Sequence, residues 1–467
     1  MDKKAKNKKE HIQLKKRLTR RIFIITLLFC STMIALTVKV GYIKVVKGAD
    51  YEKEVLKTMT DTQRDIMPQR GSINDRNGKV ISTSTITYDL ILDPKTILEM
   101  SAESQNSTYK LLSEYSKKSI QDIQTLVNNN PSSRYLVFIK HLTSEKMLAI
   151  KEKNPKGIYF EESFVRSYPK GEFASQVIGF FNKNSEGQYG IEQYYNSYLE
   201  GKAGRVFSKL QEEGIVTTEI VSPEDGKTII LTLDEVIQQY VEQTMKKYIE
   251  EQKPTNAAAI IMNPKTGEIY SMFSYPTFNP GNYLSLEEQL GSDVWGKMSK
   301  EEQEEIRYRA WKNFNTQTPY EPGSTFKPLV VAEAIEEGIL STEDTFECGG
   351  SITIAGTTIN CWKTSGHGTQ TVEEALANSC NVSLIQIGER ISNSMFSSYL
   401  KKYGFGEKTG IDLPGEAEGI LHEDGSVVDK ATNSMGQNFT STPLQLITGF
   451  SSVINGGYLL EPYIVSQ

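Results

Sequence analysis

Cysteine is scarce in this chain of 467 residues, which contains only four. Cys30 lies in an uncharged apolar run and Cys380 directly follows a serine, so only Cys348 and Cys361 are candidates for a pair. The two are thirteen residues apart. In an exported domain they could form a disulfide, or they could face each other reduced across a hairpin. The pattern leaves both alternatives open.

Histidine is equally scarce, and its four positions are isolated from one another along the chain. Metal sites are usually recognised in a sequence by His and Cys residues grouped at short, regular spacings, and no such group is apparent. The Gly-His-Gly context of His367 favours a structural role. The sequence therefore predicts neither a bound metal nor a cofactor. The four histidines are His11, His141, His367 and His422.

Positive charge is sparse beyond the first 21 residues. Those 21 residues contain ten Lys or Arg, which leaves 42 basic and 56 acidic residues in the remainder. A net charge of about −14 over the remainder argues against a nucleic-acid partner.

Charge is absent from Ile22 to Val38, directly after the basic cluster. Extended through Val40, with Lys39 reaching toward the interface, this run is just long enough to span a bilayer. A cleaved signal peptide is the alternative, but no small-x-small site follows, and Phe29 disfavours a lipoprotein site. We therefore expect a membrane anchor at 22–42, with residues 1–21 in the cytoplasm and everything after the anchor outside.

The segment from 43 to 225 reads as a separate, non-catalytic unit. An Asn-Gly turn between apolar runs at 70–82 predicts a hairpin. Residues 101–153 have a polar helical pattern, interrupted at 128–133. The segment V-S-P-E-D-G-K at 221–227 is the expected boundary.

The second unit, 226–467, is predicted to begin with a strand at 228–233 and a helix that starts at Asp234 and stops before Pro254. The stretch A-A-A-I-I-M-N-P-K-T-G-E-I-Y-S-M-F-S then reads as a strand, a turn and a returning strand. We find no internal repeat and no low-complexity tract.

The stretch Y-E-P-G-S-T-F-K-P-L at 320–329 places Ser324 three residues before Lys327. A serine hydroxyl becomes nucleophilic when a base takes its proton, and lysine can do so if burial or nearby cations keep it neutral. The Pro-Gly pair and the apolar run predict a helix start, where backbone N–H groups favour a developing anion. A capping serine with an exposed lysine is the alternative, because the same spacing recurs at Ser167 and Ser398.

A second polar turn follows in T-V-E-E-A-L-A-N-S-C-N-V. Thr371 and Glu374 have the form of a capping box, which predicts a short helix leading to S-C-N and a second helix from Val382. Ser379 and Asn381 on this turn could relay a proton and bind a substrate amide. An ordinary polar turn is the alternative.

Taken together, these stretches resemble the transpeptidase domain of a class B penicillin-binding protein. Y-E-P-G-S-T-F-K-P matches the family's nucleophile motif nearly letter for letter, and S-C-N matches its second motif. Family-like stretches run from the anchor to the last residue, among them R-G-S-I-N-D-R-N-G, G-I-E-Q-Y-Y-N-S-Y-L-E-G-K-A-G and Y-G-F-G-E-K-T-G-I-D-L-P-G-E. The C-W-K-T-S-G-H-G stretch is similar to the division and sporulation branch, more weakly.

The resemblance implies an α+β architecture. An N-terminal transmembrane helix would precede an elongated β-rich pedestal or dimerisation domain. A transpeptidase domain of the serine β-lactamase type, with an antiparallel sheet and helices, would follow. It also implies a separate glycosyltransferase and other wall-synthesis proteins as partners, since no polymerising domain fits before the pedestal.

By the same resemblance, Ser324 would attack the carbonyl of the penultimate D-Ala of a peptidoglycan stem peptide while Lys327 accepts its proton. Ser379 would pass the proton to the leaving D-Ala, and Asn381 would hold the substrate backbone. An amine from a neighbouring peptide would resolve the ester as a cross-link. β-Lactams, which mimic D-Ala-D-Ala, should acylate the same serine.

The family's third motif, a K-T-G-like triplet on a strand after S-x-N, is not found. The triplets at 265–267, 363–365 and 408–410 lie in an early turn, a cysteine-containing segment and a loop. We therefore expect the chain to be a fragment lacking the C-terminal strands, and the fragment could be inactive. A catalytically inactive scaffold of a wall-synthesis complex and a penicillin-hydrolysing β-lactamase-type enzyme are the alternative functions.

Overall fold

The computed structural model describes residues 31–42, 62–210, 216–422 and 426–466. The chain divides into two compact units, one formed by residues 1–67 and 203–223 and the other by the remainder. In the first unit, strands β1 (Thr62–Ile66), β8 (Gly204–Leu210) and β9 (Val216–Val221) form an antiparallel sheet with β8 in the centre.

Residues 31–42 of the first unit are helical. Within the described residues, no helix is both long enough and apolar enough to cross a bilayer. The anchor predicted at 22–42 lies only partly in this range, because residues 22–30 are outside the described part of the chain.

The second unit begins with a sheet built around one long strand, β3 (Val80–Leu92). β5 (Ile158–Ser167) pairs with one edge of β3, while β2 (Ile73–Asn74) and β4 (Leu136–Leu142) share its other side. The hairpin predicted at 70–82 is confirmed by the β2–β3 pair. The uniformly helical prediction for 101–153 is wrong at β4, because its side chains gain partners across from β3 that local sequence preference does not reveal.

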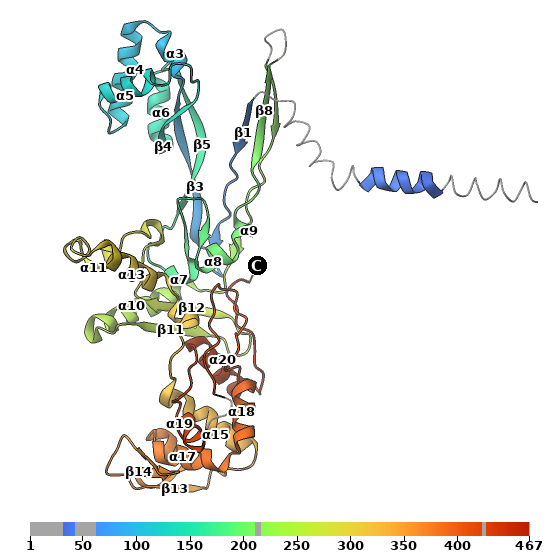
Figure 1. The fold of residues 1–467 in the computed structure, drawn as a ribbon, viewed down its shortest axis with the longest axis vertical. Helices are drawn as coiled ribbons and strands as arrows, with labels where there is room; N and C mark the ends of the chain where they lie inside the picture. Colours follow the sequence, from blue (N-terminus) through green and yellow to red (C-terminus); the bar gives the residue numbers. More distant parts are fainter. Residues whose placement is uncertain (1–30, 43–61, 211–215, 423–425, 467) are drawn as a thin grey trace, which may run out of the picture. The chain divides into compact units, whose positions relative to one another are not determined.

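Helices α3 to α6 gather at one end of β3, β4 and β5 (Figure 1) and bury a small core that includes Leu90, Leu112, Ile123 and Val127. Each of the four helices begins at an Asp, Ser or Thr whose side chain accepts a bond from a backbone N–H of the first turn. Their bounds are α3 Pro94–Leu98, α4 Ala102–Tyr115, α5 Ile120–Asn128 and α6 Ser144–Glu152.

A buried ion cluster joins distant stretches below this end. Glu192 is fully buried and accepts bonds from Arg70 at 2.8 Å and from Arg166 at 2.7 Å, while the Tyr168 hydroxyl donates to it at 3.0 Å. Glu192 belongs to the short helix α8 (Gly190–Tyr194). Arg70 precedes β2, Arg166 lies in β5 and Tyr168 directly follows that strand. Two stretches that are far apart in the sequence, R-G-S-I-N-D and G-I-E-Q-Y-Y, thus meet in the fold through the ion pair of Arg70 and Glu192. The small elements nearby are α7 Ser175–Ile178, β6 Phe180–Phe181, β7 Gly187–Gln188 and α9 Asn196–Leu199.

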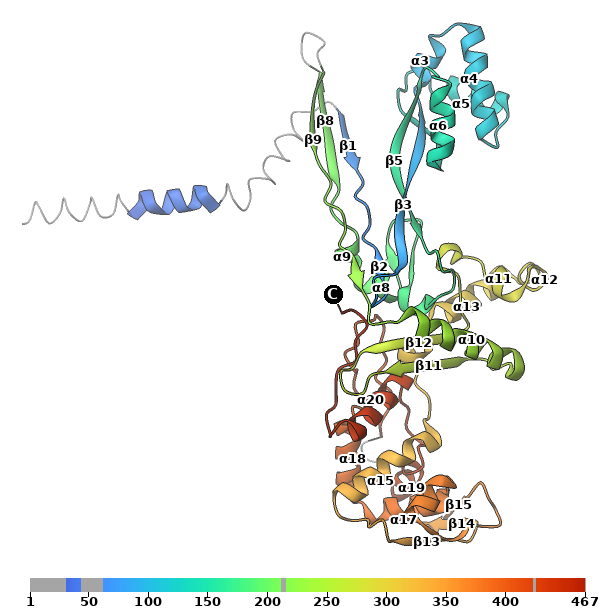
Figure 2. The ribbon, with the colours of Figure 1, turned by 180° about the vertical axis from the view of Figure 1, so that it is seen from behind.

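The first elements after residue 225 are close to the prediction. Helix α10 (Glu235–Gln252) is capped by Asp234, and β11 (Ala257–Met262) pairs antiparallel with β12 (Ile269–Tyr275), beside which α10 lies (Figure 2). The predicted strand at 228–233 is shorter, since only β10 (Ile229–Ile230) pairs with β2. A core containing Ile73, Ile229, Met272 and Ile464 packs these strands together.

Most of the elements after residue 312 form a largely helical region around a second core, which includes Phe326, Leu329, Leu384 and Phe439. Two small strand pairs, β13–β16 and β14–β15, lie at its edge (Figure 1). The helices between residues 280 and 311 pack around a separate small core that includes Phe180, Phe278 and Ala310. The helices and 3₁₀ turns are η2 Pro280–Asn282, α11 Glu287–Leu290, α12 Ser292–Trp295, α13 Lys300–Trp311, α14 Phe314–Gln317, η3 Gly323–Phe326, α15 Lys327–Glu336, α16 Val372–Ala377, α17 Asn381–Arg390, α18 Asn393–Lys402, α19 Val427–Asn433 and α20 Pro443–Ile454. The strands are β13 Thr345–Cys348, β14 Ser351–Ile354, β15 Thr357–Asn360 and β16 Gly368–Thr371.

Candidate active site

Ser324 lies in the 3₁₀ turn η3, directly before α15, and it is exposed. The sequence predicted a helix start here, and the structure adds that the first turn is 3₁₀ rather than α. Phe326 anchors the turn: it is 2% exposed, and its ring lies 4.9 Å from Phe439 and 5.5 Å from Phe405, centroid to centroid. The buried Phe326 ring therefore fixes the turn to the core, while Ser324 on the same turn faces solvent.

The chain before Ser324 is tied to the segment around 436–441. Tyr320 and Ser441 exchange two backbone hydrogen bonds of 2.9 Å, and Gly323 N–H donates to Gly436 O at 2.7 Å. A Cβ added at Gly436 would lie 2.0 Å from the Gly323 carbonyl oxygen. Glycine is therefore required at 436 for the backbones to approach this closely.

The S-C-N segment is the turn between α16 and α17. The capping box of Thr371 and Glu374 starts α16, as predicted. Its end is a Schellman motif: Ser379 N–H bonds to Leu376 O, and Cys380 N–H to Ala375 O, both at 2.9 Å.

Ser379 occupies the left-handed position of this motif, with φ of 48°. Glycine is the usual residue there because a Cβ makes this conformation cost roughly 1–2 kcal/mol. A serine held in this conformation is a feature that functional sites show more often than other surfaces.

Lys327 connects the two motifs. Its Nζ donates to the carbonyl oxygen of Ser379 at 2.8 Å, to the Ser379 hydroxyl at 3.0 Å and to Asn381 Oδ1 at 2.7 Å. The lysine is 1% exposed, and in the described part of the chain no carboxylate pairs with it. All three acceptors are neutral.

Burial lowers the pKa of Lys327 to about 8, with a smaller opposing influence from the neighbouring Cys380 thiol. Near neutral pH a useful fraction of the amine is therefore uncharged and able to accept a proton. The structure shows no hydrogen bond between Lys327 and Ser324. In unliganded active sites, catalytic hydrogen bonds often form only once the substrate is bound.

The structure thus brings together Lys327, Ser379 and Asn381 and places Ser324 one turn before the lysine. None of the triplets considered for the third motif lies on a strand: 265–267 form the β11–β12 turn, 363–365 lie in the loop between β15 and β16, and 408–410 belong to another loop. In that loop, Thr409 bonds to Glu416 rather than to any of the four candidate residues.

Sequence reasoning missed a cluster beside the S-C-N turn. The sequence pattern suggests no partner for Cys380 or for His367. In the structure both lie beside Cys348 and Cys361, and the ligand atoms of these four residues are within 4.8 Å of one another. All three cysteines are free. The ligand spacings of twelve, five and twelve intervening residues match no common metal motif, so only the fold reveals the cluster.

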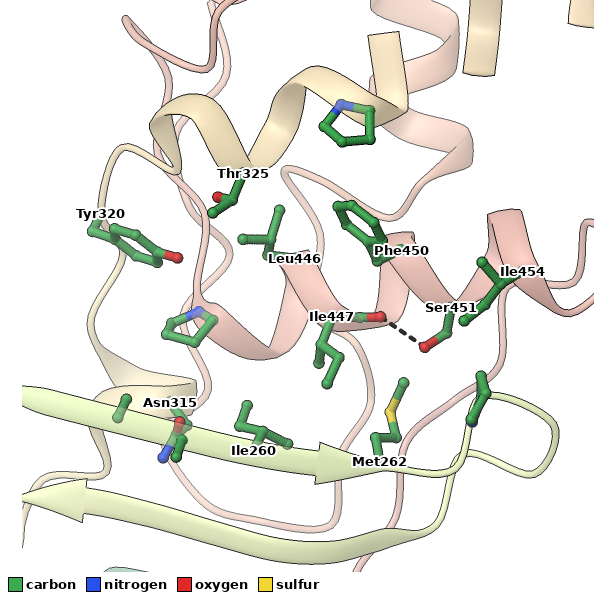
Figure 3. A pocket seen from close by; sticks show the side chains of 15 residues that line it. Ile260, Met262, Asn315, Tyr320, Thr325, Leu446, Ile447, Phe450, Ser451 and Ile454 are labelled. Atoms are coloured by element: carbon green, nitrogen blue, oxygen red, sulfur yellow. Dashed lines mark hydrogen bonds between the residues drawn. The ribbon is translucent and has the colours of Figure 1, made fainter. Parts of the chain in front are cut away.

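An apolar pocket of about 520 Å³ lies on another side of the η3 turn. Figure 3 shows Ile260 and Met262 from β11 facing Leu446, Ile447 and Phe450 from α20, with Thr325 at one end. Neither Ser324 nor Lys327 lines it. The pocket is therefore a neighbour of the candidate active site and not the place where its polar groups converge.

Comparison with known proteins gives two family matches. The penicillin binding protein transpeptidase domain matches residues 257–467, and the penicillin-binding protein dimerisation domain matches residues 65–231. The first match contains all four candidate residues.

Among curated relatives, Stage V sporulation protein D of Bacillus subtilis is 32% identical over 466 residues, which cover 96% of this chain and 67% of that protein. Peptidoglycan D,D-transpeptidase FtsI of Escherichia coli is 24% identical, over 83% of this chain and 63% of that protein. The chain spans about two thirds of the length of such relatives.

Among solved structures, penicillin binding protein 2X from Streptococcus thermophilus superposes with a TM-score of 0.70 and 26% identity, covering 86% of this chain and 61% of that one. The family match defines residues 257–467 as a penicillin binding protein transpeptidase domain. The chain belongs to the penicillin-binding protein family, with an α+β transpeptidase domain and a dimerisation domain.

Proposed function

We propose that this chain carries the catalytic serine of a membrane-anchored peptidoglycan D,D-transpeptidase, which cross-links stem peptides and is acylated by β-lactams. The observation that carries the proposal is the contact set of Lys327, a buried amine held only by neutral oxygens of Ser379 and Asn381. Such an amine can accept and return a proton, which a salt-bridged lysine could not do readily.

In the first step, Ser324 Oγ attacks the carbonyl carbon of the penultimate D-Ala while its proton passes to Lys327. The resulting oxyanion is stabilised by N–H donors that include the backbone of Ser324 at the start of the turn. The bond to the terminal D-Ala then breaks, and its amine takes up the proton through Ser379, which lies 3.0 Å from the Lys327 Nζ.

Asn381 has a separate role in this scheme. Its Oδ1 accepts from Lys327, and its Nδ2 makes only a long 3.5 Å bond to the carbonyl of Asn360. That amide is therefore available to donate to the substrate backbone. In the second half-reaction, the amine of another stem peptide attacks the ester carbon and Lys327 takes its proton. The bond to Ser324 Oγ then breaks, and Lys327 returns that proton to the serine oxygen.

The rest of the organisation is part of the same proposal. Residues 1–21 form a cytoplasmic tail, 22–42 a single membrane anchor, 43–225 a pedestal and 226–467 the transpeptidase region outside the membrane. The uncharged run after the basic cluster supports the anchor. A separate glycosyltransferase supplies the glycan strands, and wall-synthesis proteins bind the pedestal.

A fluorescent penicillin tests the acylation step on the complete product of the gene. Ser324→Ala should abolish covalent labelling, since the attacking oxygen is gone. Ser398→Ala is the matched control: that serine also precedes a lysine by three residues, but it lies inside α18 and its lysine, Lys401, is exposed whereas Lys327 is buried. Labelling that survives in Ser324→Ala, or an equal loss in both variants, would contradict the proposal.

A further inference from the structure

The cysteine–histidine cluster is built from three segments between residues 348 and 380, namely the end of β13, the 361–367 loop and the S-C-N turn. Cys348 ends β13, Cys361 follows β15, His367 precedes β16, and Cys380 is the N-cap of α17. The three thiols are 1%, 2% and 0% exposed, and Ile352 and Val382 pack against them. The cluster is thus enclosed and shielded from solvent.

Its dimensions suit one tetrahedral ion. The Sγ atoms of Cys361 and Cys380 are 3.9 Å apart, and His367 Nδ1 lies 3.6 Å from the Sγ atoms of both Cys348 and Cys361. Zinc bound to sulfur at about 2.3 Å and to nitrogen at about 2.0–2.1 Å separates tetrahedral ligands by about 3.5–3.8 Å. The spacings in the structure are close to these.

The surroundings also favour a metal-bound sulfur. Ser383 donates to Cys380 Sγ from its backbone N–H at 3.5 Å and from its hydroxyl at 3.3 Å. Gln370 in turn donates to the Ser383 hydroxyl at 3.3 Å. Donors of this kind, placed at a helix N-terminus, stabilise negative charge on a ligand sulfur and fix its orientation.

We propose that Cys348, Cys361, His367 and Cys380 bind one zinc ion. Thiolate and imidazole ligands in tetrahedral array select zinc, and the short spacings suit one ion rather than an iron–sulfur cluster. Four protein ligands complete its coordination, so no position remains for water or substrate. The ion is structural.

Its consequence concerns the S-C-N turn. Cys380 lies between Ser379 and Asn381, the two residues that hold Lys327. Zinc would tie this turn to β13 and to the 361–367 loop, and so hold the strained Ser379 conformation in place. The four ligands are positioning residues. Zinc binding itself does not depend on the proposed function.

Metal analysis of the complete protein, purified without chelators from zinc-containing medium, tests the site. The wild type should contain about one zinc per chain, His367→Ala well under half of that, and His367→Cys about one again, because four cysteines also bind zinc. His422→Ala is the control, since His422 is exposed and outside the cluster. Thermal unfolding of each variant verifies that it is folded.

Because a ligand variant could fail to fold, a second measurement uses the wild type alone. Titration with an organomercurial should release zinc in step with the modification of three buried thiols. Wild-type protein without zinc, zinc retained equally in His367→Ala, or a Cys361–Cys380 disulfide in place of the ion would overturn the proposal.

A final arm rests on the proposed function. Penicillin should acylate His367→Ala at least about tenfold more slowly than His367→Cys, because only His367→Cys retains the zinc ion that holds the S-C-N turn in place. A wild type with full zinc but no acylation would contradict the transpeptidase proposal and leave the zinc site standing. Equal acylation in both variants would overturn the positioning role.

Discussion

Two buried ionisable side chains of this protein, Lys327 and Glu192, are held in opposite ways. Lys327 is surrounded by neutral oxygen atoms, two of Ser379 and one of Asn381. Glu192 is paired charge for charge, with one carboxylate oxygen bonded to Arg70 and the other to Arg166.

The difference separates a reactive group from a structural one. A buried charge held only by neutral dipoles is easily converted to its uncharged form, which suits proton transfer. A carboxylate between two guanidinium groups is compensated, and removing it leaves buried positive charge without a partner. Changes at Lys327 should therefore affect chemistry, and changes at Glu192 should affect folding.

The largest expected effect is on acylation. Lys327→Met replaces the amine with an apolar chain of similar length and should slow acylation of Ser324 by a β-lactam about 10³-fold or more, because the general base is lost. Its thermal unfolding temperature should change little. The control is Lys401→Met, which changes the lysine of another Ser-x-x-Lys pair, on α18. Its Ser324 should be acylated at the wild-type rate.

The same amine predicts the pH dependence. Because burial lowers the pKa of Lys327 to about 8, the uncharged fraction grows as pH rises toward 8 and saturates above it. Stopped-flow acylation rates should therefore increase from pH 6 to 8 and then level off. A rate that is flat over this range would show that Lys327 does not act as the base.

The opposite outcome is expected for the ion cluster. Glu192→Ala should destabilise the protein by roughly 3–5 kcal/mol, because two buried guanidinium groups lose their shared partner. Chemical denaturation monitored by circular dichroism measures this. As a control, Glu224→Ala removes the partner of an exposed ion pair with Lys202 and should leave the free energy of unfolding nearly unchanged. Equal, small losses of stability in both variants would show that the buried ion cluster does not stabilise the fold more than an exposed ion pair does.

Ser379 allows stability and chemistry to be separated at one position. Ser379→Gly should stabilise the turn by about 0.4–1 kcal/mol, since glycine accepts a φ of 48° without strain. It should also slow acylation about 10²-fold, because the hydroxyl that relays the proton is missing. Differential scanning calorimetry and acylation rates on the same sample test both parts. Unchanged acylation would exclude Ser379 from the proton path.

The last comparison concerns Glu333 on α15, where only the pH dependence of stability should change. Burial raises the pKa of its carboxyl to about 8, and its Oε1 has no hydrogen-bond partner among the described residues. The folded protein therefore keeps this group neutral while the unfolded chain ionises above its ordinary value of 4.5. Stability from this residue is complete below pH 4.5 and is lost progressively between 4.5 and 8.

Glu333→Gln should accordingly be more stable than the wild type by about 3 kcal/mol at pH 7, with the difference vanishing below pH 4.5. Denaturation midpoints at pH 4 and pH 7 measure it. Glu336→Gln, exposed on the same helix, should show no such pH-dependent gain. A difference that persisted at pH 4 would assign the effect to packing rather than to ionisation.

Much of this arrangement could be predicted from the sequence where local signals are strong. The Asp234 cap, the Asn-Gly hairpin and the Thr371 capping box are short-range features, and the structure contains all three. Ser324 and Lys327 were recognisable because their motif is contiguous. The family resemblance, and not spacing, assigned Ser379 and Asn381 to the same site as Lys327, and their hydrogen bonds to the lysine appear only in the structure.

The remaining features depend on contacts between distant segments. Glu192 lies 122 residues from Arg70, and its role appears only when β2, β5 and α8 are assembled. The Cys–His cluster draws on β13, the 361–367 loop and the S-C-N turn, and its ligand spacings match no common metal motif, so the sequence alone does not reveal it. β4 was missed because its pairing with β3, rather than its own composition, makes it a strand.

The central claim is that the Ser324 hydroxyl is the acyl acceptor. The most direct measurement is mass spectrometry of peptides from the complete protein after brief exposure to a β-lactam. The account predicts one added mass equal to the intact β-lactam, located on Ser324 in the peptide that contains Y-E-P-G-S-T-F-K. An adduct on any other residue, or folded protein with no adduct, would contradict it.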